Sequence, residues 1–453
     1  MNNASFEVDN IMRSNRLLKH FRWLPFGLLL LVSYSIKAQE KPTEINELNQ
    51  LWNQYGLSER HHAGLVIHDV DLHQDIFSYK PDNYFIPASN IKILTMYASL
   101  YYLKDTIEAG WYMESGDSLI VWGGGDPGTF YPEIDTTSYF IEFLKKNPKF
   151  IYFSDNHFQT TRFGKGWAWD DYPFTYQCER NAFPIYGNRI WIQRTQDTLS
   201  IVPSYLASVI QVVKDTFTDT GKSEWGDGYF YTYDGTHETE EEEIPITFFK
   251  NDLKYCWSEA TNRQIEYIDR PFVPGAIPIP GSLRDTLIKE MMFESDNLIA
   301  EQLLLACSQK AFGEMNEELA IGRLLFGPLA EFKQDLEWVD GSGLSRYNLA
   351  TPRSMIEVLS QMLRVKGLDY MKAVMPAGGK SGTLITDFKG KNNQPYIYAK
   401  SGSLKHTYCL SGILVTNSGK VLLFSWMNNQ YHGSQRELKS GMEKIFSFLY
   451  DQY

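Results

Sequence analysis

Residues 87–92 read Pro-Ala-Ser-Asn-Ile-Lys, and an apolar helical pattern continues from them to Leu100. Ser89 and Lys92 stand three positions apart, which places both side chains on one face of a helix. The start of a helix also favours negative charge as it develops on a hydroxyl. A lysine can act as a base near neutral pH only when burial or a neighbouring cation lowers its pKa. The hexapeptide therefore predicts a serine nucleophile with a lysine base in a partly closed site; an ordinary surface helix is the alternative interpretation.

Such a site needs further polar groups, and the triplet Ser-Asp-Asn occurs twice, at 154–156 and 295–297. The first copy follows the strand-like run 150–153, whereas the second joins two helical patterns. A corner between helices can point a hydroxyl and an amide into a cleft. We therefore predict Ser295 and Asn297 as site residues and interpret the earlier triplet as structural.

The triplet Lys-Ser-Gly occurs three times, starting at Lys380, Lys400 and Lys439. Lys380 follows a glycine-containing loop, and Lys439 falls within a helical pattern near the end of the chain. Lys400 ends a β-like run and precedes another predicted strand. An edge strand with a lysine, a hydroxyl and Gly402 can present a cation to a carboxylate and let a ligand approach its backbone closely. We therefore predict that Lys400 is the site lysine.

Ser-x-x-Lys, Ser-Asp-Asn and Lys-Ser-Gly, in this order, are typical of β-lactamases and penicillin-binding proteins. The long stretch between Ser89 and Ser295 is more than a compact β-lactamase has room for. Beyond residue 38 the chain resembles the D-alanyl-D-alanine carboxypeptidase/endopeptidase family, the class C low-molecular-mass penicillin-binding proteins. Ser401 stands where this family usually has threonine, which keeps the hydroxyl. The blocks that resemble the family are 85–92, 123–127, 166–171, 295–297, 340–346, 382–384 and 399–404.

This resemblance implies an α/β (α+β) fold, with a penicillin-binding-protein/β-lactamase-like transpeptidase domain in which helices flank an antiparallel sheet. It also implies a mainly β accessory insertion. Residues 1–38 are expected to be a signal peptide, 39–104 and 277–453 the catalytic domain, and 105–276 the inserted accessory domain or domains. The acidic run 238–243 in this insertion is expected to be a solvated loop.

The resemblance implies acyl transfer at Ser89, which would attack the carbonyl between two D-alanines with Lys92 as its base. Water or another amine would then resolve the acyl-enzyme. Ser295 and Lys92 would pass the proton to the leaving amine, and Asn297 would hold the substrate amide. The expected substrates are the stem peptides of peptidoglycan, and β-lactam antibiotics would be covalent inhibitors.

The third motif is implied to bind the terminal carboxylate of the substrate through Lys400, Ser401 and Ser403, beside Gly402. The backbone N–H groups of Ser89 and Ser403 would form the oxyanion hole, as in relatives. No cofactor and no metal ion are expected in this chemistry.

Three residues outside the catalytic motifs match positions with which relatives recognise diaminopimelate. Asp171 falls where relatives place an aspartate that receives the free amine, and Tyr176 falls where they have an aromatic residue. Arg346 matches an arginine that faces the carboxylate of the same group. Together the three would hold a zwitterion through charge-assisted contacts. A turn or cap for Asp171 and a structural ion pair for Arg346 are the alternative interpretations.

The start of the chain has the pattern of an export signal. Basic residues precede the apolar run 23–32, and the chain then reaches Ile-Lys-Ala-Gln at 36–39. This pattern is typical of a secretory signal peptide, with cleavage expected after Ala38. The apolar run is well short of the roughly 20 residues that span a bilayer. We therefore expect export to the periplasm, and peripheral membrane association stays open.

Composition excludes some classes of partner. The 453 residues have a formal net charge of −12, which argues against nucleic-acid binding. The four cysteines form no close-spaced pair of the kind that binds zinc. In an oxidising compartment, Cys178 and Cys256 could form a disulfide.

Three other functions stay open. A secreted serine β-lactamase would need fast deacylation, and no residue for that step is identified. A non-catalytic peptidoglycan-binding protein is disfavoured because every required side chain is present. A serine esterase that uses a tyrosine is disfavoured because residues 295–297 occupy the place of that tyrosine.

Overall fold

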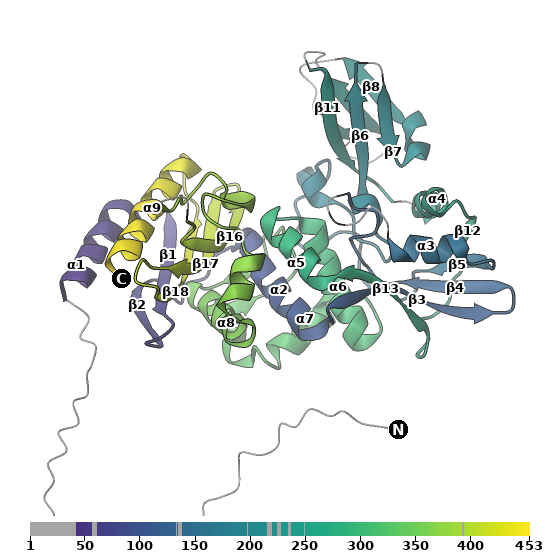
Figure 1. Cartoon of the computed structure of the whole chain (residues 1–453). Coiled ribbons are helices and arrows are strands. Elements are labelled where there is room, and N and C mark those ends of the chain that lie inside the picture. Colours follow the sequence, from purple (N-terminus) through teal and green to yellow (C-terminus); the bar gives the residue numbers. More distant parts are fainter. Residues whose placement is uncertain are drawn as a thin grey trace, which may run out of the picture. The chain divides into compact units, whose positions relative to one another are not determined.

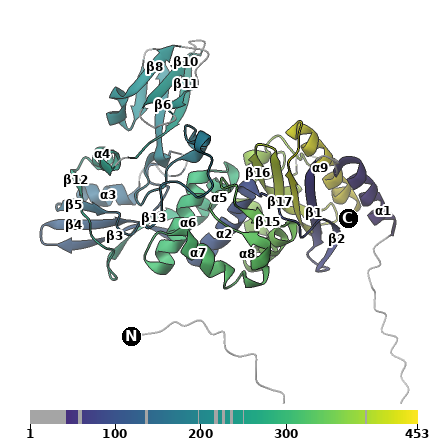
Figure 2. The same cartoon turned by 180° about the vertical axis from the view of Figure 1, so that it is seen from behind.

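The computed structural model describes residues 42–453, apart from 57–60, 133, 135–137, 197, 215–219, 224–227, 234–236, 249 and 392–393. The signal peptide predicted for residues 1–38 therefore lies outside the described residues. Among the residues that are described, no helix combines the length and the apolar character that crossing a membrane requires. Figures 1 and 2 show the elements from two opposite sides.

A five-stranded antiparallel sheet joins the two ends of the described chain. Its strands, in spatial order, are β16 (Ile397–Leu404), β17 (Thr407–Val415), β18 (Val421–Asn429), β1 (His62–Asp69) and β2 (Gln74–Tyr79). Apolar side chains alternate along β16, β17, β18 and β1, so these four strands contribute to two cores, whereas β2 contributes to one of them. Within this sheet, β1 and β2 form one antiparallel hairpin and β17 and β18 another.

Helices cover both faces of this sheet (Figure 1). On one face lie α1 (Pro42–Leu51), the π-helical turn Trp52–Gly56 and α9 (Gln435–Gln452), which share a core with alternate strand residues. On the other face lie α2 (Ile91–Tyr102) and α8 (Pro352–Val374). Burial of one large apolar side chain stabilises such a core by about 1.5–3 kcal/mol. The fold is thus the expected α/β (α+β) arrangement of helices around an antiparallel sheet.

Three more helices extend the core that contains α2 and α8 away from the sheet. They are α5 (Arg284–Phe293), α6 (Asn297–Phe312) and α7 (Glu317–Leu325). Their buried residues pack in the same cluster as α2 and α8. Between α7 and α8, the strands β14 (Leu336–Glu337) and β15 (Leu349–Ala350) form a two-stranded antiparallel pair.

A second five-stranded sheet has its own core and is mixed. Its spatial order is β12 (Ile265–Tyr267), β5 (Phe150–Ser154), β4 (Ser118–Gly123), β3 (Thr106–Ser115) and β13 (Ile277–Leu283). The three strands β12, β5 and β4 run parallel, and the others are antiparallel. Helices α3 (Tyr139–Lys146) and α4 (Lys250–Thr261) belong to the same part of the chain.

Two three-stranded sheets complete this part. One contains β8 (Ile210–Lys214), β10 (Tyr229–Tyr233) and β9 (Gly221–Lys222), and the other contains β11 (Thr239–Pro245), β6 (Arg189–Thr195) and β7 (Leu199–Val202). The loop expected at 238–243 is therefore wrong, because residues 239–245 form strand β11, but Glu241 and Glu242 are exposed to solvent as expected. Arginines of β6 pair with the carboxylates across the ladder, which offsets the repulsion within the acidic run.

We call residues 106–283, from β3 to β13, the accessory region, and the other described residues the core region. Residues 277–283 were expected to belong to the catalytic domain, but they form β13, which pairs with β3 in the accessory sheet. The suggested disulfide is absent as well. All four cysteines are described, and Cys178 and Cys256 are buried free thiols like the other two.

Candidate active site

Ser89 lies in a short 3-10 turn that leads directly into α2. The turn is strained, because Ala88 has a φ of 48°, in the left-handed region. Two glycines of the core region let other backbone segments press against it. A Cβ on Gly343 would lie 2.0 Å from the carbonyl oxygen of Ala88. A Cβ on Gly402 would lie 2.6 Å from the carbonyl oxygen of Pro87. The position of Ser89 is therefore fixed from two sides.

Lys92 lies one helical turn beyond Ser89 and is fully buried. Its Nζ atom is 3.0 Å from Ser89 Oγ, 2.5 Å from Asn297 Oδ1 and 2.8 Å from the carbonyl oxygen of Ser342. The structure thus brings together the nucleophile, the lysine and the amide that the sequence predicted. The contact with Ser342 was not predicted.

Burial lowers the pKa of Lys92 to about 8, although the charges of Asp296, Asp340 and Glu301 oppose this shift. A substantial fraction of this amine is therefore neutral just above neutral pH. The neutral amine has a lone pair that can accept the proton of Ser89. Lys92 consequently meets both requirements for a base, geometry and proton affinity.

Ser295 and Lys400 form a second pair at the same site. Ser295 has a φ of 60° at the corner between α5 and α6, and Lys400 Nζ donates to its Oγ at 2.9 Å and to the Ser401 carbonyl oxygen at 2.9 Å. Burial, together with the charge of Lys92, lowers the pKa of Lys400 well below its usual range, while Glu294 opposes this. Ser295 was expected to act together with Lys92 in proton transfer, and the lysine to which it is hydrogen-bonded among the described residues is Lys400.

Asn297 connects the two regions of the molecule. It is the first residue of α6, and while its Oδ1 accepts from Lys92, its Nδ2 donates to the carbonyl oxygen of Tyr176 at 2.8 Å. Tyr176 belongs to the accessory region. The amide side chain is therefore held at both ends, with its orientation set by a lysine on one side and a backbone carbonyl on the other.

Asp296, to which no role was assigned from the sequence, stabilises the corner between α5 and α6. Its Oδ1 accepts from the backbone N–H of Ile299, which caps α6. Its Oδ2 accepts from Arg189 at 2.6 Å and from the Tyr131 hydroxyl at 2.7 Å. Burial would raise the pKa of Asp296, but the Arg189 charge and these hydrogen bonds leave it lowered.

Strand β16 presents the remaining residues of the third motif. Ser401 Oγ donates to Thr383 Oγ1 at 2.8 Å, and Ser403 Oγ accepts from Gln435 Nε2 at 2.9 Å. Ser403 is exposed, and Gly402 between them is buried against the Ser89 turn. Of the other two Lys-Ser-Gly copies, the first directly precedes Thr383 but has Lys380 exposed in a loop, and in the second Lys439 of α9 pairs with Asp387.

The three residues expected to recognise diaminopimelate are only partly brought together. Asp171 ends a 3-10 turn, and its Oδ1 accepts from the Tyr176 hydroxyl at 2.8 Å. Arg346 is exposed, and its backbone N–H donates to the Gly166 carbonyl oxygen at 3.3 Å. The block 340–346 thus touches the segment that leads to Asp171 through its backbone.

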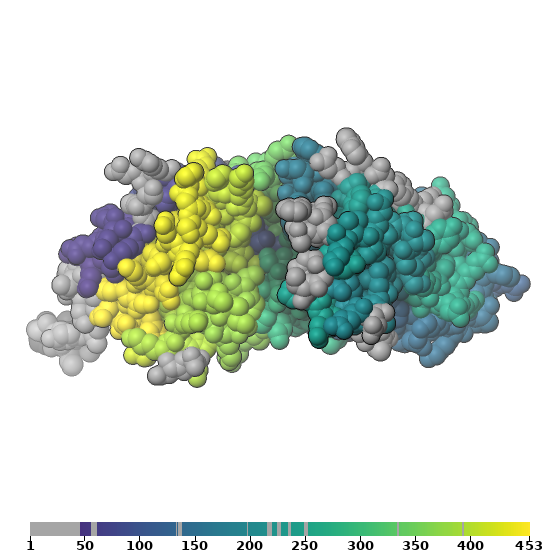
Figure 3. All heavy atoms as spheres, turned by 90° about the horizontal axis from the view of Figure 1, so that it is seen from above, coloured from purple at the N-terminus to yellow at the C-terminus, as the bar shows by residue number. Residues whose placement is uncertain are grey.

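A cavity of about 550 Å³ opens beside the Ser295 corner, between residues of both regions. A larger cavity of about 850 Å³ lies on the sheet of β6, β7 and β11 and shares Thr175 and Glu243 with the first. Figure 3 shows a hollow between the surfaces of the C-terminal part and the accessory strands. The residues that line the smaller cavity are Tyr131, Thr175, Tyr176, Arg189, Glu243, Glu290, Glu294, Ser295, Asp296 and Asn297.

Sequence reasoning missed the buried carboxylates around Lys92. Asp340 was quoted only as the start of a family block, and Glu301 was not considered. Glu301 stands inside the apolar run 298–305, where a charged residue is unusual, and this was the available signal. Among the described residues, no group of three or more His, Cys, Asp or Glu side chains is arranged to hold a metal ion.

Comparison with known proteins gives a consistent result. A model of the family described as D-Ala-D-Ala carboxypeptidase 3 (S13) matches residues 46–224 and 283–450. D-alanyl-D-alanine carboxypeptidase DacB of Haemophilus influenzae is 23% identical over 94% of this chain and 96% of its own length. D-alanyl-D-alanine carboxypeptidase of Actinomadura sp. is 23% identical over 82% of this chain and 78% of its own.

Among solved structures, penicillin binding protein 4 (dacB) from Haemophilus influenzae has the same fold. It superposes with a TM-score of 0.70 at 20% identity and covers 90% of this chain and 99% of its own. Its complex with a β-lactam superposes with a TM-score of 0.64 over the same shares of the two chains.

Proposed function

Because the chain belongs to the D-Ala-D-Ala carboxypeptidase 3 (S13) family and is a serine-type D-Ala-D-Ala carboxypeptidase, we propose that Ser89 is its nucleophile. The observation that supports this most directly is the 3.0 Å contact between Ser89 Oγ and Lys92 Nζ at the start of α2. Burial lowers the pKa of Lys92 to about 8, so the lysine can act as the base. The core region would then be the catalytic domain.

In the acylation step, neutral Lys92 takes the proton of the Ser89 hydroxyl as the oxygen attacks the carbonyl between the two D-alanines. A tetrahedral intermediate forms, and its oxyanion would accept hydrogen bonds from the backbone N–H groups of Ser89 and Ser403. The close approach of Gly402 to the Ser89 turn supports this pairing of N–H groups. The amide C–N bond then breaks.

The leaving amine must gain a proton, and Ser295 is the proposed donor. Lys400 donates a hydrogen bond into the Ser295 oxygen, so the hydroxyl hydrogen of Ser295 can point to another acceptor. The proton that Ser295 gives up would be replaced from the lysines of the site. Terminal D-alanine leaves, and the acyl group stays on Ser89 as an ester until water hydrolyses it.

Lys400, Ser401 and Ser403 are proposed to bind the terminal carboxylate of the substrate. The pKa of Lys400 lies well below its usual range in the free site, because of burial and the charge of Lys92. A bound carboxylate would oppose both effects and favour the charged lysine. Asn297 would contact the amide of the bound peptide, since its side chain is already oriented by Lys92 and Tyr176.

We further propose that the enzyme also cleaves cross-links that contain diaminopimelate. The pair of Asp171 and Tyr176 supports this, because its carboxylate is accessible to an ammonium group at the mouth of the site. Arg346, exposed on the neighbouring block, would face the carboxylate of the same group. The substrates would then be stem peptides of peptidoglycan in the periplasm, to which the basic and apolar start of the chain points.

Intact-mass analysis after incubation with benzylpenicillin tests the nucleophile. We expect one covalent adduct on the wild-type chain and none on Ser89→Ala, and an adduct retained by the variant would overturn the assignment. Nitrocefin separates a carboxypeptidase from a β-lactamase, since the former should label stoichiometrically and the latter should turn it over. Mass spectrometry of products from purified muropeptides would separate terminal D-alanine removal from cross-link cleavage.

A further inference from the structure

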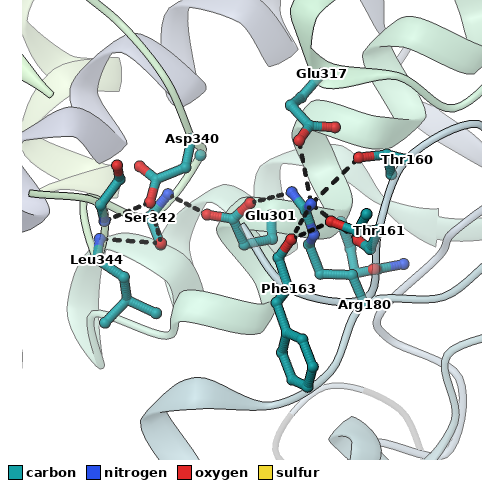
Figure 4. A network of polar contacts seen from close by, with 12 residues as sticks. Thr160, Thr161, Phe163, Arg180, Glu301, Glu317, Asp340, Ser342 and Leu344 are labelled. Atoms are coloured by element: carbon teal, nitrogen blue, oxygen red, sulfur yellow. Dashed lines mark hydrogen bonds and ion pairs between the residues drawn. The ribbon is translucent and has the colours of Figure 1, made fainter. Parts of the chain in front are cut away.

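A buried arginine of the accessory region reaches the helix that borders the site. The Arg180 side chain is 0% exposed and is shared between two carboxylates (Figure 4). Its Nη1 atom donates to Glu301 Oε2 at 3.0 Å, and Nη2 donates to Glu317 Oε1 at 3.1 Å. Backbone carbonyl oxygens of Thr161 and Phe163 accept from Nη2 as well, at 2.9 and 3.0 Å. The guanidinium is thus fixed by the accessory region itself.

The other carboxylate oxygen of Glu301 is connected to Lys92 through one residue, Ser342. Glu301 Oε1 accepts from the backbone N–H of Ser342 at 2.8 Å. The carbonyl oxygen of the same Ser342 accepts from Lys92 Nζ at 2.8 Å. A chain of three hydrogen bonds therefore leads from Arg180 to Lys92, and Figure 4 shows its Glu301 part.

The turn that contains Ser342 is held by carboxylates on both sides. Asp340 Oδ1 accepts from the N–H of Gly343, and Asp340 Oδ2 accepts from the N–H of Ser345. Only Glu301 is described as accepting from the N–H of Ser342 itself, among the hydrogen bonds of the described residues. The direction of the Ser342 carbonyl therefore depends on Glu301 as well as on Asp340.

The charge of Glu301 depends in turn on Arg180. Burial raises the pKa of Glu301 to about 7, and the charges of Asp340 and Glu317 act in the same direction. The charge of Arg180 and the hydrogen bond from Ser342 oppose the rise. Since an arginine stays charged at all relevant pH values, Arg180 opposes a further rise in the pKa of Glu301, and the carboxyl is mostly ionised only above about pH 7.

We propose that Arg180 is a positioning residue for acylation: it holds Glu301 in its charged form, and Glu301 holds the Ser342 carbonyl against Lys92. Through this contact the accessory region sets the protonation of the catalytic base. The proposal rests on the proposed role of Lys92. Lys92 is faced by Asp296 and Glu301 from α6, by Asp340 from the turn, and by Lys400 from β16.

The expected effect of losing Arg180 has a definite sign. Without the arginine, the pKa of Glu301 rises further, so Glu301 stays protonated to higher pH and no longer stabilises the charged form of Lys92 there. The pKa of Lys92 then falls, so the neutral base is present at lower pH. The acid limb of the acylation rate against pH should therefore move to lower pH, by roughly half a unit or more. The plateau at high pH should fall, because the turn is held less firmly.

A role limited to stabilising the fold predicts something different. It would lower the fraction of active enzyme and the unfolding temperature, but the midpoint of the pH profile would stay in place. The experiment therefore measures the second-order rate of acylation by a fluorescent penicillin from pH 5 to 10, on folded protein of known active fraction. The variants are Arg180→Gln, Arg180→Lys, Glu301→Gln and the double variant Arg180→Gln/Glu301→Gln.

We expect Arg180→Gln and Glu301→Gln to move the acid limb in the same direction, and the double variant to move it no further than Glu301→Gln. Arg180→Lys keeps the charge and should keep the wild-type midpoint. Removal of both buried partners is better tolerated than removal of one, so the double variant keeps the test open if Arg180→Gln does not fold.

Glu317→Gln is the matched control, because Glu317 shares Arg180 with Glu301 but is not bonded to Ser342. Its loss removes a charge that raises the pKa of Glu301, so no shift of the limb to lower pH is expected. An unchanged midpoint in Arg180→Gln and Glu301→Gln would overturn the proposal. Failure of the wild type to be acylated would instead overturn the proposed function.

Discussion

Two lysines of the core region and two arginines of the accessory region have different kinds of partners. Lys92 and Lys400 of the core region are bonded to hydroxyl, amide and backbone carbonyl oxygens, without a carboxylate among their described hydrogen-bond partners. Arg180 and Arg189 of the accessory region each bind carboxylates. One of the two carboxylates of each arginine lies on α6 or at its N-cap.

This difference separates reactive cations from structural ones. A buried lysine without a carboxylate partner loses proton affinity, and its neutral form becomes available for proton transfer. An arginine does not lose its proton, so it can keep a buried carboxylate charged and in place. Helix α6 and its cap, with Asp296 and Glu301, are where the two kinds of charge meet.

The sharpest way to break this comparison is to remove the reactive cation. Lys92→Ala should reduce the rate of acylation by benzylpenicillin by about 10²–10⁴-fold, which is the range for loss of a general base. In the wild type, the rate should rise with pH around a midpoint near 8, because the neutral amine of Lys92 is the proposed base. Stopped-flow labelling across pH measures both quantities.

Lys380→Ala is the control for this substitution, since Lys380 lies in an exposed loop. It should be acylated at the wild-type rate. A Lys92→Ala variant that is acylated normally would contradict the proposal that Lys92, a buried lysine without a carboxylate among its described hydrogen-bond partners, is the base.

Loss of Arg189, one of the two arginines that bind carboxylates, should affect stability more than chemistry. Arg189→Gln leaves Asp296 as a buried carboxylate with a weaker set of partners, and about 3 kcal/mol of unfolding free energy should be lost. The pKa of Asp296 is lowered in the fold, so this contribution is present at neutral pH and disappears as the pH falls through the lowered value. Urea unfolding at pH 7 and under acid conditions measures the loss.

Arg194→Gln on the same strand is the matched control for Arg189→Gln. Arg194 pairs with Glu240, and it does not contact α6 among its described partners. Its loss should cost less than about 1 kcal/mol. Equal losses in the two variants would mean that the pair with Asp296 has no special role.

The sequence was informative where a local pattern was sufficient. The helix after Ser89 and the corner at Ser295 both follow from residues within about one or two helical turns of each other. The partners of Arg180 could not be predicted in this way, because Arg180 and Glu301 are 121 residues apart. The acidic run 238–243 was misread for a similar reason. The repulsion between its carboxylates is offset by arginines of β6, and the pairing of β6 with β11 cannot be predicted from neighbouring residues alone.

The second lysine sharpens the comparison, since its charge is expected to depend on the substrate. Lys400→Ala should lower kcat/KM about tenfold to a hundredfold for a peptide with a free terminal carboxylate, the range for a hydrogen bond to a charged group. A peptide with an amidated terminus should lose less from the same substitution. The ratio of the two losses isolates the carboxylate contact from the contact with Ser295.

Lys380→Ala serves here too, because it starts another Lys-Ser-Gly triplet. It should leave both peptides unaffected. If Lys380→Ala impairs acylation and Lys400→Ala does not, the third motif was assigned to the wrong triplet.

The smallest expected effect concerns Asp171, the accessory-region carboxylate that has no buried arginine among its described partners. It accepts from the Tyr176 hydroxyl, and Tyr176 is 43% exposed, so solvent competes with any bound amine. Asp171→Ala should therefore lower kcat/KM for a diaminopimelyl peptide by only about tenfold, or ~1.4 kcal/mol. Acylation by benzylpenicillin, which lacks that amine, should change much less, because the contact is remote from the bond that breaks. Asp170→Ala removes the same charge one position away and should affect neither substrate. An equal loss on both substrates would make Asp171 a structural residue of its turn.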